Sequence, residues 1–419
     1  MKQFRVFNPE HDMALANGDK HFIAPRNIRE MAHDLAPLLE VVDCEHPLVW
    51  GWDMAIAEQL RREGIPTEEL PSEASLTALR THSERKMAHQ ILYAFRADKP
   101  DGPYAGESAI IRHTEEIAAY AAQHKHIVLK DPLSSSGKGL RHVNIDEDEN
   151  DNDNDNEKEK DNYQRGALKK VENWANALIT RHGYLTAEPF YRKEQDFAME
   201  FYVLNGQCHF IGYSLFMTNH HGRYEESILM EDEKIEERLA HYVPRMALRE
   251  LQSWVIEHHH CIIPKEWDTA RFPLYFGIDM MVVETTDKVA FEREQRLLAD
   301  SAERSNFNEV NGQQTTDAIR KANFQFLLHP CVEINLRLNM GIIAHEVRRR
   351  VLAPQSEGTF HVAAFPTTEA LHHFQQEQLL NHPATYQEEK VVSGYHPLTP
   401  IAQNTRHHAY VICKQENNR

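Results

Sequence analysis

The amino-acid sequence predicts a protein of the α/β (α+β) class that contains two to four folded units. The chain has 419 residues, whereas a single domain usually has about 100–200. Short β-rich segments are interspersed with amphipathic helical segments. Hydrophobic residues make up 41% of the chain and charged residues 26%, so a sizeable core can form. These three observations indicate a mixed architecture of helices and sheets.

The first 80 residues are predicted to form a small α/β unit. Residues 3–8 alternate as a strand does. A helix is expected over residues 27–42, and Pro37 should kink or split it. Asp53 has the position of an N-cap residue for the next helix, and Gly64 suits the position just after its end.

The next segments predict a second unit that alternates helix and strand. Ser83 is expected to cap a helix. Residues 126–129 form a short apolar strand that ends at Lys130. A further amphipathic helix is expected over residues 166–182, with Gly183 ending it.

A low-complexity acidic tract separates this strand from this helix. Residues 146–161 contain ten acids and two lysines, so the tract contributes −8 to the net charge of −18 and leaves −10 for the other 403 residues. Such a tract cannot bury enough apolar surface to order itself. We therefore predict that residues 146–162 are a disordered surface insertion.

The clearest local prediction is a β-hairpin. Residues 196–204 and 207–216 are β-rich and are separated by Asn205-Gly206, the pair that favours a type I′ turn. A helix is expected over residues 238–260, kinked at Pro244. The remaining predictions are strands over 272–283 and 327–336, a polar insertion over 301–323, a helix over 370–380 and a strand over 410–413.

The composition excludes several classes of protein. An acidic chain without a basic stripe is a poor general binder of nucleic acid, which needs clustered Lys and Arg. The N-terminus has no apolar region typical of a signal peptide, and no run of about 18 apolar residues indicates a membrane span. The five scattered cysteines fit neither a disulfide framework nor a zinc site. A reducing cytoplasm is the expected location.

A first candidate site combines Lys130 with the Ser/Gly-rich segment 134–139. Glycines allow successive backbone N–H groups to turn toward an anion, and a lysine adds a positive charge. This combination suits a triphosphate, although it is not a Walker A loop. By itself it is more often a plain surface loop.

Two further acids follow at a strand end and in the predicted hairpin. Glu188 precedes Pro189 and Phe190, and Asp196 lies shortly after them. A carboxylate there can accept from a ribose hydroxyl or an exocyclic amine. Considered alone, an ordinary connection between strand and hairpin is the favoured explanation.

Polar side chains also interrupt two apolar strands. Asp279 lies in the first, and Glu333, Asn335 and Arg337 share one face of the second because alternate strand residues point the same way. A buried carboxylate needs a cation, hydrogen bonds or solvent. The oxygens suit Mg²⁺, which also binds substrate phosphates. A half-exposed strand with polar alternation is about equally compatible.

The segment after the first strand is less informative. Asn8, Glu10, His11 and Asp12 occupy a place where small α/β domains often bind ligands. A capped turn is the more common explanation of such a sequence, and a substrate role is the alternative.

In their order and spacing these segments resemble the ATP-grasp superfamily, which includes D-alanine–D-alanine ligase and biotin carboxylase. The resemblance covers roughly residues 83–345. It implies two α+β subdomains preceded by a small pre-ATP-grasp domain. The implied units are 1–82 (N-terminal), 83–190 (small subdomain), 191–350 (large subdomain with the metal site) and 351–419 (C-terminal segment packing on the core).

The resemblance also implies roles for individual residues. Lys138 and Arg337 correspond to catalytic groups, and Asp279, Glu333 and Asn335 to metal ligands. The residues implied to bind nucleotide are Lys86, Lys130, Ser135, Ser136, Gly137, Gly139, Glu188, Pro189, Phe190 and Asp196. Lys86 is the loosest match, and Asp196 replaces the usual Glu. Gly277 stands where the D-alanine ligases have a catalytic arginine, which leaves open whether Arg337 replaces it.

The function implied by the resemblance is an ATP- and Mg²⁺-dependent carboxylate–amine ligase, with Mn²⁺ as an alternative metal. ATP would convert a carboxylate to an acyl phosphate, which an amine then attacks. A phosphotransferase with another acceptor and a non-catalytic nucleotide-binding regulator are the alternatives. Many relatives dimerise, so a homodimer is compatible. The expected partners are ATP and small substrates, with no nucleic acid and no membrane.

Overall fold

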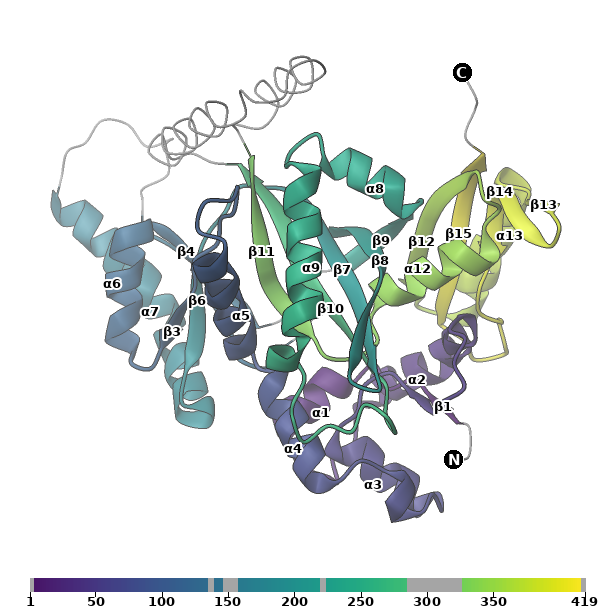
Figure 1. Ribbon diagram of the computed structural model, residues 1–419, viewed down its shortest axis with the longest axis horizontal. Helices are drawn as coiled ribbons and strands as arrows, with labels where there is room; N and C mark the ends of the chain where they lie inside the picture. The colour runs from purple at the N-terminus through teal and green to yellow at the C-terminus, as the bar shows by residue number, and fades with distance from the viewer. Residues whose placement is uncertain (1–3, 135–138, 146–156, 219–223, 285–325, 416–419) are drawn as a thin grey trace, which may run out of the picture.

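The computed structural model describes residues 4–134, 139–145, 157–218, 224–284 and 326–415. The described strands form a parallel pair, a four-stranded sheet and a nine-stranded sheet (Figure 1). The prediction of a mixed α+β fold is therefore confirmed. The predicted insertion over 301–323 and most of the acidic tract, residues 146–156, lie outside the described residues.

The N-terminal unit is the small α/β structure that the sequence predicts. Its elements are β1 (Arg5–Val6), α1 (His11–Asn17), α2 (Arg26–Leu35), the 3₁₀ helix η1 (Ala36–Val41), β2 (Leu48–Val49), α3 (Met54–Arg62), η2 (Thr67–Glu69) and α4 (Glu73–His82). The predicted split at Pro37 is confirmed, because α2 ends at Leu35 and a 3₁₀ helix follows. The Asp53 carboxylate caps α3 by accepting from the Ile56 N–H at 2.9 Å.

The four-stranded sheet is antiparallel and has the order β3-β6-β4-β5. Its strands are β3 (Ala109–Ile111), β4 (His126–Lys130), β5 (Leu140–Asn144) and β6 (Leu185–Pro189), and α6 (Thr114–His124) and α7 (Glu157–His182) supply the rest of its apolar core. The prediction of an insertion as far as residue 162 was wrong at its end, because α7 already begins at Glu157. Gly183, with φ of 79°, follows α7 as expected.

The nine described strands of the large sheet have the order β11-β10-β7-β8-β9-β12-β15-β14-β13. They are β7 (Lys193–Leu204), β8 (Gln207–Thr218), β9 (Tyr224–Leu229), β10 (Leu274–Glu284), β11 (Phe326–Asn335), β12 (Ser356–Ala364), β13 (Thr385–Gln387), β14 (Lys390–Pro397) and β15 (His407–Gln415). Asn205 and Gly206 join β7 to β8 with φ angles of 52° and 72°, which confirms the predicted turn. The C-terminal segment thus extends the large sheet.

Helices cover both faces of this sheet. They are α5 (Arg85–Asp98), α8 (Asp232–Leu239), α9 (Arg245–Ile262), α12 (Met340–Val351) and α13 (Thr368–Asn381). The prediction of one kinked helix over 238–260 was wrong, because α8 ends before Pro244 and α9 begins after it. Ser83 does not cap α5; it ends α4, where its hydroxyl donates to the Leu79 carbonyl. Helix α5 packs in the core of the large sheet.

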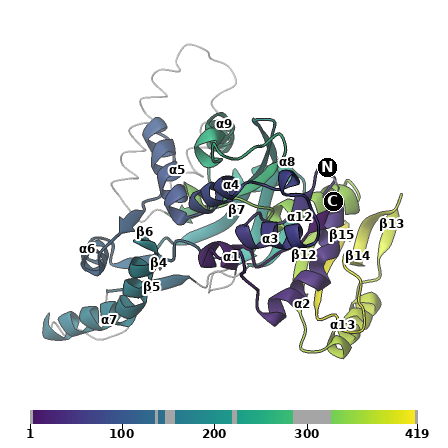
Figure 2. The same ribbon diagram turned by 90° about the horizontal axis from the view of Figure 1, so that it is seen from below.

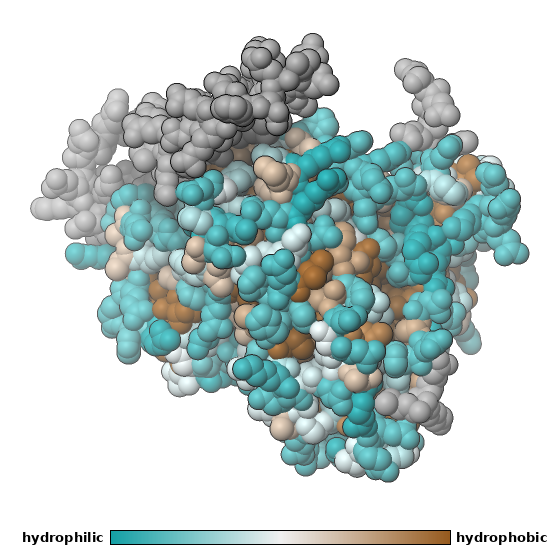
Figure 3. Space-filling model, viewed as in Figure 1, coloured by the Kyte–Doolittle hydropathy of each residue, from teal (hydrophilic) through white to brown (hydrophobic). Residues whose placement is uncertain are grey.

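The three parts lie side by side along the long axis of the molecule. The small sheet with α6 and α7 lies at one end, strands β7, β10 and β11 in the middle, and β13, β14 and α13 at the other end (Figures 1 and 2). The N-terminal unit lies against the middle. Figure 3 shows that this face is mostly hydrophilic, with hydrophobic side chains confined to small recesses.

All five cysteines are free, as expected, and no described helix is long and apolar enough to cross a membrane.

A pH-dependent contribution to stability is predicted at α12. Burial of His345 opposes its charge, but the carboxylates of Asp232 and Glu346, which lie 3.6 and 3.9 Å from its ring nitrogens, outweigh burial and raise its pKa from 6.5 to about 9. The contribution is therefore complete below pH 6.5 and is lost as the pH rises through 9. Between pH 6 and 10 we expect the wild type to lose about 2–3 kcal/mol of unfolding free energy that the His345→Gln variant does not lose. Urea denaturation at both pH values measures this, and equal losses would contradict it.

Candidate active site

A buried ion pair joins two of the residues that were predicted to bind nucleotide. Lys130 ends β4, and its Nζ lies 2.5 Å from Glu188 Oε2 on the neighbouring strand β6. The side chains are 7% and 10% exposed, so the charges depend on each other and on any ligand that reaches them. The two residues were predicted to belong to one nucleotide site, and the structure brings them into contact.

Buried polar atoms near this pair lack partners in the described part of the chain. They include Thr186 Oγ1, which lies on β6 beside Lys130, and both ring nitrogens of His329. The His329 side chain is completely buried, and its burial, reinforced by Lys130, lowers its pKa to about 3. A buried donor or acceptor without a partner lowers the stability of the fold, so these atoms are suited to hydrogen-bond a polar ligand.

The other predicted nucleotide contacts lie around this pair or on the large sheet. Phe190 stacks on His126 with ring centroids 4.1 Å apart. Its N–H donates to the His126 carbonyl at 2.9 Å, so this N–H is not available to adenine. Pro189 ends β6, next to Phe190. Asp196 lies on β7, where its carboxylate accepts from Lys193 and from the Thr218 hydroxyl.

The three predicted metal ligands lie together on β10 and β11. Asp279 pairs directly with Glu333, and the Asn335 amide donates to Asp279 at 3.3 Å. A β-bulge follows Asp279 in this pairing, a feature that is frequent beside active sites. Burial, and next the Glu333 charge, raise the pKa of Asp279. An oxygen-only set with two mutually repelling carboxylates fits Mg²⁺.

This set is smaller than a complete protein-made metal site. Among the described residues no group of three or more His, Cys, Asp and Glu side chains could hold an ion. Two carboxylates and an amide would leave the rest of the coordination shell to water and substrate phosphates, which is usual for Mg²⁺.

Arg85 contacts the candidate site and was not predicted from the sequence. It is the first residue of α5, it is 8% exposed, and its Nη1 lies 3.1 Å from Glu333 Oε2. It also donates to the carbonyls of Asp131 and Ser134, at the start of the Gly-rich segment. The predicted residue Lys86 is exposed. The sequence did contain a signal for Arg85. Position 85 lies on the same helix face as the buried Ala88, Leu92 and Phe95, so the side chain at 85, not at 86, is expected to point inward.

The Gly-rich segment is described only at its ends. Ser135, Ser136, Gly137 and Lys138 lie outside the described residues. Gly139 is buried, and a Cβ atom there would lie 2.0 Å from the Ser134 Oγ. Glycine is therefore required at 139 to bring the two ends of the segment together.

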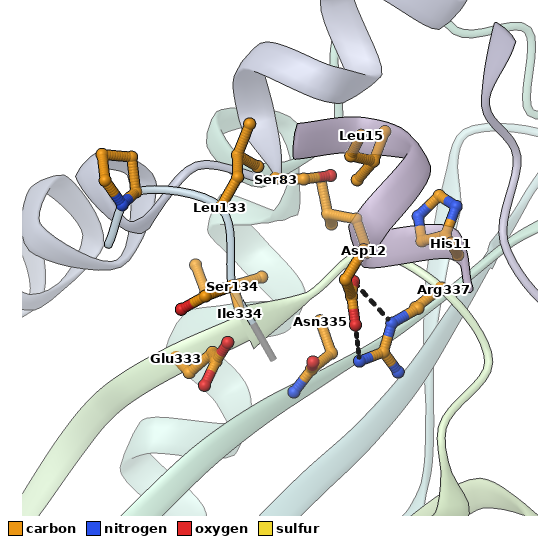
Figure 4. Close-up of a pocket in the computed structure, with 12 residues that line it drawn as sticks. His11, Asp12, Leu15, Ser83, Leu133, Ser134, Glu333, Ile334, Asn335 and Arg337 are labelled. Atoms are coloured by element: carbon orange, nitrogen blue, oxygen red, sulfur yellow. Dashed lines mark hydrogen bonds and ion pairs between the residues drawn. The ribbon is translucent and has the colours of Figure 1, made fainter. Parts of the chain in front are cut away.

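The N-terminal unit completes the cleft. Asp12 on α1 accepts from Arg337 Nε at 3.1 Å and from Nη2 at 2.8 Å, and Arg337 Nη1 donates to the Leu338 carbonyl. Figure 4 shows Ser134 and Glu333 at one end of this cleft, Asn335 in the centre, and Arg337, Asp12 and His11 at the other end. Much of the hydrogen-bonding capacity of Arg337 is thus committed to holding α1.

Gly277, the departure noted in the sequence, has a local explanation. It lies between Asn335 and the buried Glu200 in the sheet. A Cβ atom at 277 would lie 2.4 Å from both Glu200 Oε2 and Asn339 Nδ2, which hydrogen-bond each other at 2.7 Å. Burial raises the pKa of Glu200 to about 8. No side chain fits at 277 while this pair occupies the space.

The structure of this chain is similar to several solved protein structures. N5-carboxyaminoimidazole synthase from Aspergillus clavatus, in complex with ADP and 5-aminoimidazole ribonucleotide, has a TM-score of 0.42 and 11% identity over 88% of this chain and 77% of that chain. The N5-carboxyaminoimidazole synthetase of Staphylococcus aureus, complexed with ADP, has a TM-score of 0.42 and 10% identity over 98% and 94%. Biotin carboxylase from Campylobacter jejuni has a TM-score of 0.43 and 12% identity over 92% and 74%. Searches of protein-family models and of curated proteins found no match.

Proposed function

We propose that the chain is an ATP-grasp enzyme that uses ATP and Mg²⁺ to activate a carboxylate as an acyl phosphate, which an amine then attacks. The observation that carries the proposal is the position of Arg85. This buried guanidinium contacts Glu333, one of the proposed metal ligands, and the carbonyls that begin the Gly-rich segment. It also interacts electrostatically with the Glu188 carboxylate. Arg85 thus connects a proposed metal ligand on the large sheet with the start of the proposed phosphate-binding segment that follows β4.

The proposed roles follow from charge. Lys130 and Arg85 would offset the charge of the ATP phosphates, and Asp279, Glu333 and Asn335 would hold Mg²⁺. Mg²⁺ held there would supply positive charge that offsets the negative charge of the phosphates. Phosphoryl transfer mainly needs such positioning and charge stabilisation. The Ser/Gly-rich segment would cover the phosphates and exclude water, which would otherwise hydrolyse an acyl phosphate.

The test is a screen for ADP release with Mg²⁺ or Mn²⁺. Amino acids, hydroxy acids and small peptides are supplied first alone and then with amines, and the products are identified by mass spectrometry. We expect one class of carboxylate to raise ADP release at least about tenfold, a change in barrier of about 1.4 kcal/mol. An amide should form when the amine is added.

Two other results would contradict the proposal. A stable phosphorylated product without an amide would favour the phosphotransferase alternative. ATP binding without stimulated ADP release by any compound would favour a nucleotide-binding regulator.

A further inference from the structure

The N-terminal unit contains a His–Asp dyad that opens into the cleft. His11 Nδ1 lies 3.1 Å from Asp53 Oδ2, and the two side chains are 1% and 3% exposed. His11 also lines the cleft that contains Glu333, Asn335 and Arg337 (Figure 4). The dyad comes from two separate elements of the N-terminal unit, α1 and the cap of α3.

The position of His11 is strongly fixed. Asp53 Oδ1 accepts from the Ile56 N–H, and Asp53 Oδ2 accepts from the Asn8 side chain at 3.3 Å as well as facing His11. Asn8 is itself held by the N–H and carbonyl of Gly51. A Cβ atom at position 51 would lie 2.3 Å from the His11 ring, so Gly51 makes room for the imidazole.

This network also fixes which ring nitrogen carries the proton. The Asp53 carboxylate accepts the N–H that caps α3, so it acts as an acceptor toward His11 too. Nδ1 must then donate, and Nε2 of the neutral ring holds the free lone pair. Nε2 has no hydrogen-bond partner among the described residues. It is also not one of the fully buried polar atoms that lack a partner, so it is accessible from the cleft that His11 lines.

The chemistry of the cleft suggests a use for that lone pair. The proposed phosphate and metal groups lie at the end marked by Ser134 and Glu333, whereas His11 lies at the other end, beyond Asn335 (Figure 4). With nucleotide filling the first end, a second substrate approaches from the His11 end. An attacking amine must lose a proton as it forms an amide.

We propose that His11, oriented by Asp53, accepts this proton from the amine substrate; the inference rests on the proposed ligase function. The amine nitrogen forms a bond to the acyl carbon, and the bond between that carbon and the phosphate oxygen breaks with its electron pair leaving on phosphate. The proton from nitrogen passes to Nε2 and then to the departing phosphate or to solvent. His11 is thus a catalytic residue and Asp53 a positioning residue.

The test separates carboxylate activation from amine attack. Hydroxylamine is largely unprotonated at neutral pH and reacts readily with acyl phosphates, so it reports activation as a hydroxamate. The amine that gives an amide in the same assay reports the second step. The His11→Asn variant retains a donor to Asp53 but has no Nε2, and the Asp53→Asn variant retains His11 but favours the wrong tautomer.

We expect His11→Asn to lower amide formation about 100-fold or more while hydroxamate formation changes less than about threefold. Asp53→Asn should shift the amide-to-hydroxamate ratio in the same direction. Retained hydroxamate formation shows that each variant is folded. His408→Asn, a replacement of another buried histidine, serves as the matched control and should leave the ratio unchanged.

Three results would overturn the proposal. Equal loss of both products in His11→Asn would indicate a structural role, and loss of neither would remove the role altogether. If the wild type forms no hydroxamate with any carboxylate, the ligase function fails and the proton-accepting role fails with it. The wild-type measurement thus distinguishes failure of the function from failure of the dyad.

Discussion

Replacing Glu333 and Asn335 together with alanine is expected to abolish ATP turnover, lowering it at least about 1,000-fold while the fold is retained. Both residues lie on β11 and are two of the three proposed oxygen ligands. Removing them leaves only Asp279, on the neighbouring strand β10, to hold Mg²⁺. The measurement is ADP release in the presence of the activating carboxylate, together with the thermal unfolding midpoint of each protein.

The matched control changes the same residue types elsewhere. Glu377 and Asn381 are exposed on α13, far from the cleft, and their double alanine variant should turn over ATP normally (Figure 1). Undiminished turnover in the Glu333/Asn335 variant would show that the metal site lies elsewhere. Unfolding of that variant would instead be visible in its melting curve.

Replacing Lys130 with methionine is expected to destabilise the protein by about 3–5 kcal/mol, because it leaves the Glu188 carboxylate buried without its partner. A second change, Glu188→Leu, should recover most of this loss, since apolar residues of similar volume often replace a buried pair without cost. Both variants should bind Mg²⁺–ATP poorly. Urea denaturation measures stability, and calorimetric titration measures nucleotide binding.

The control is a half-buried ion pair of the same residue types on the surface of the protein. Lys234 and Glu357 lie 2.8 Å apart, and each side chain is 33% exposed. Lys234→Met should therefore cost no more than about 1 kcal/mol and leave nucleotide affinity unchanged. A comparable loss at both positions would mean that the buried pair has no special energetic role. Normal nucleotide affinity in Lys130→Met would remove Lys130 from the proposed nucleotide site.

The elements with strong local signals were predictable from the sequence. The Asn205-Gly206 turn, the cap at Asp53 and the split at Pro37 depend on backbone preferences that act over a few residues. Such preferences operate in any tertiary context. The errors at Ser83 and Pro244 have the same local character, because a serine or proline between two helices fits the end of one as well as the start of the next.

The long-range parts of the site were not predictable in this way. Asp12 and Arg337 are 325 residues apart in the sequence, and no local pattern indicates that they pair. Arg85 was not predicted because its neighbour Lys86 matched the lysine that was expected to bind phosphate. In the structure Arg85 is the buried residue of the two. Glu200 was hidden inside a β-rich run, and only its pairing with Asn339 explains why position 277 is a glycine.

The order of strands in the large sheet constrains how the chain acquires its structure. Strand β9 pairs with β12, which lies more than 120 residues later, and β12 in turn pairs with β15 near the C-terminus. During synthesis, β9 therefore has no partner on one side until residues 356–364 have left the ribosome. Pairings this distant in sequence slow folding, and open edges invite association with other chains. The strands that carry the proposed chemistry, β7, β10 and β11, belong to a sheet that only the final residues complete.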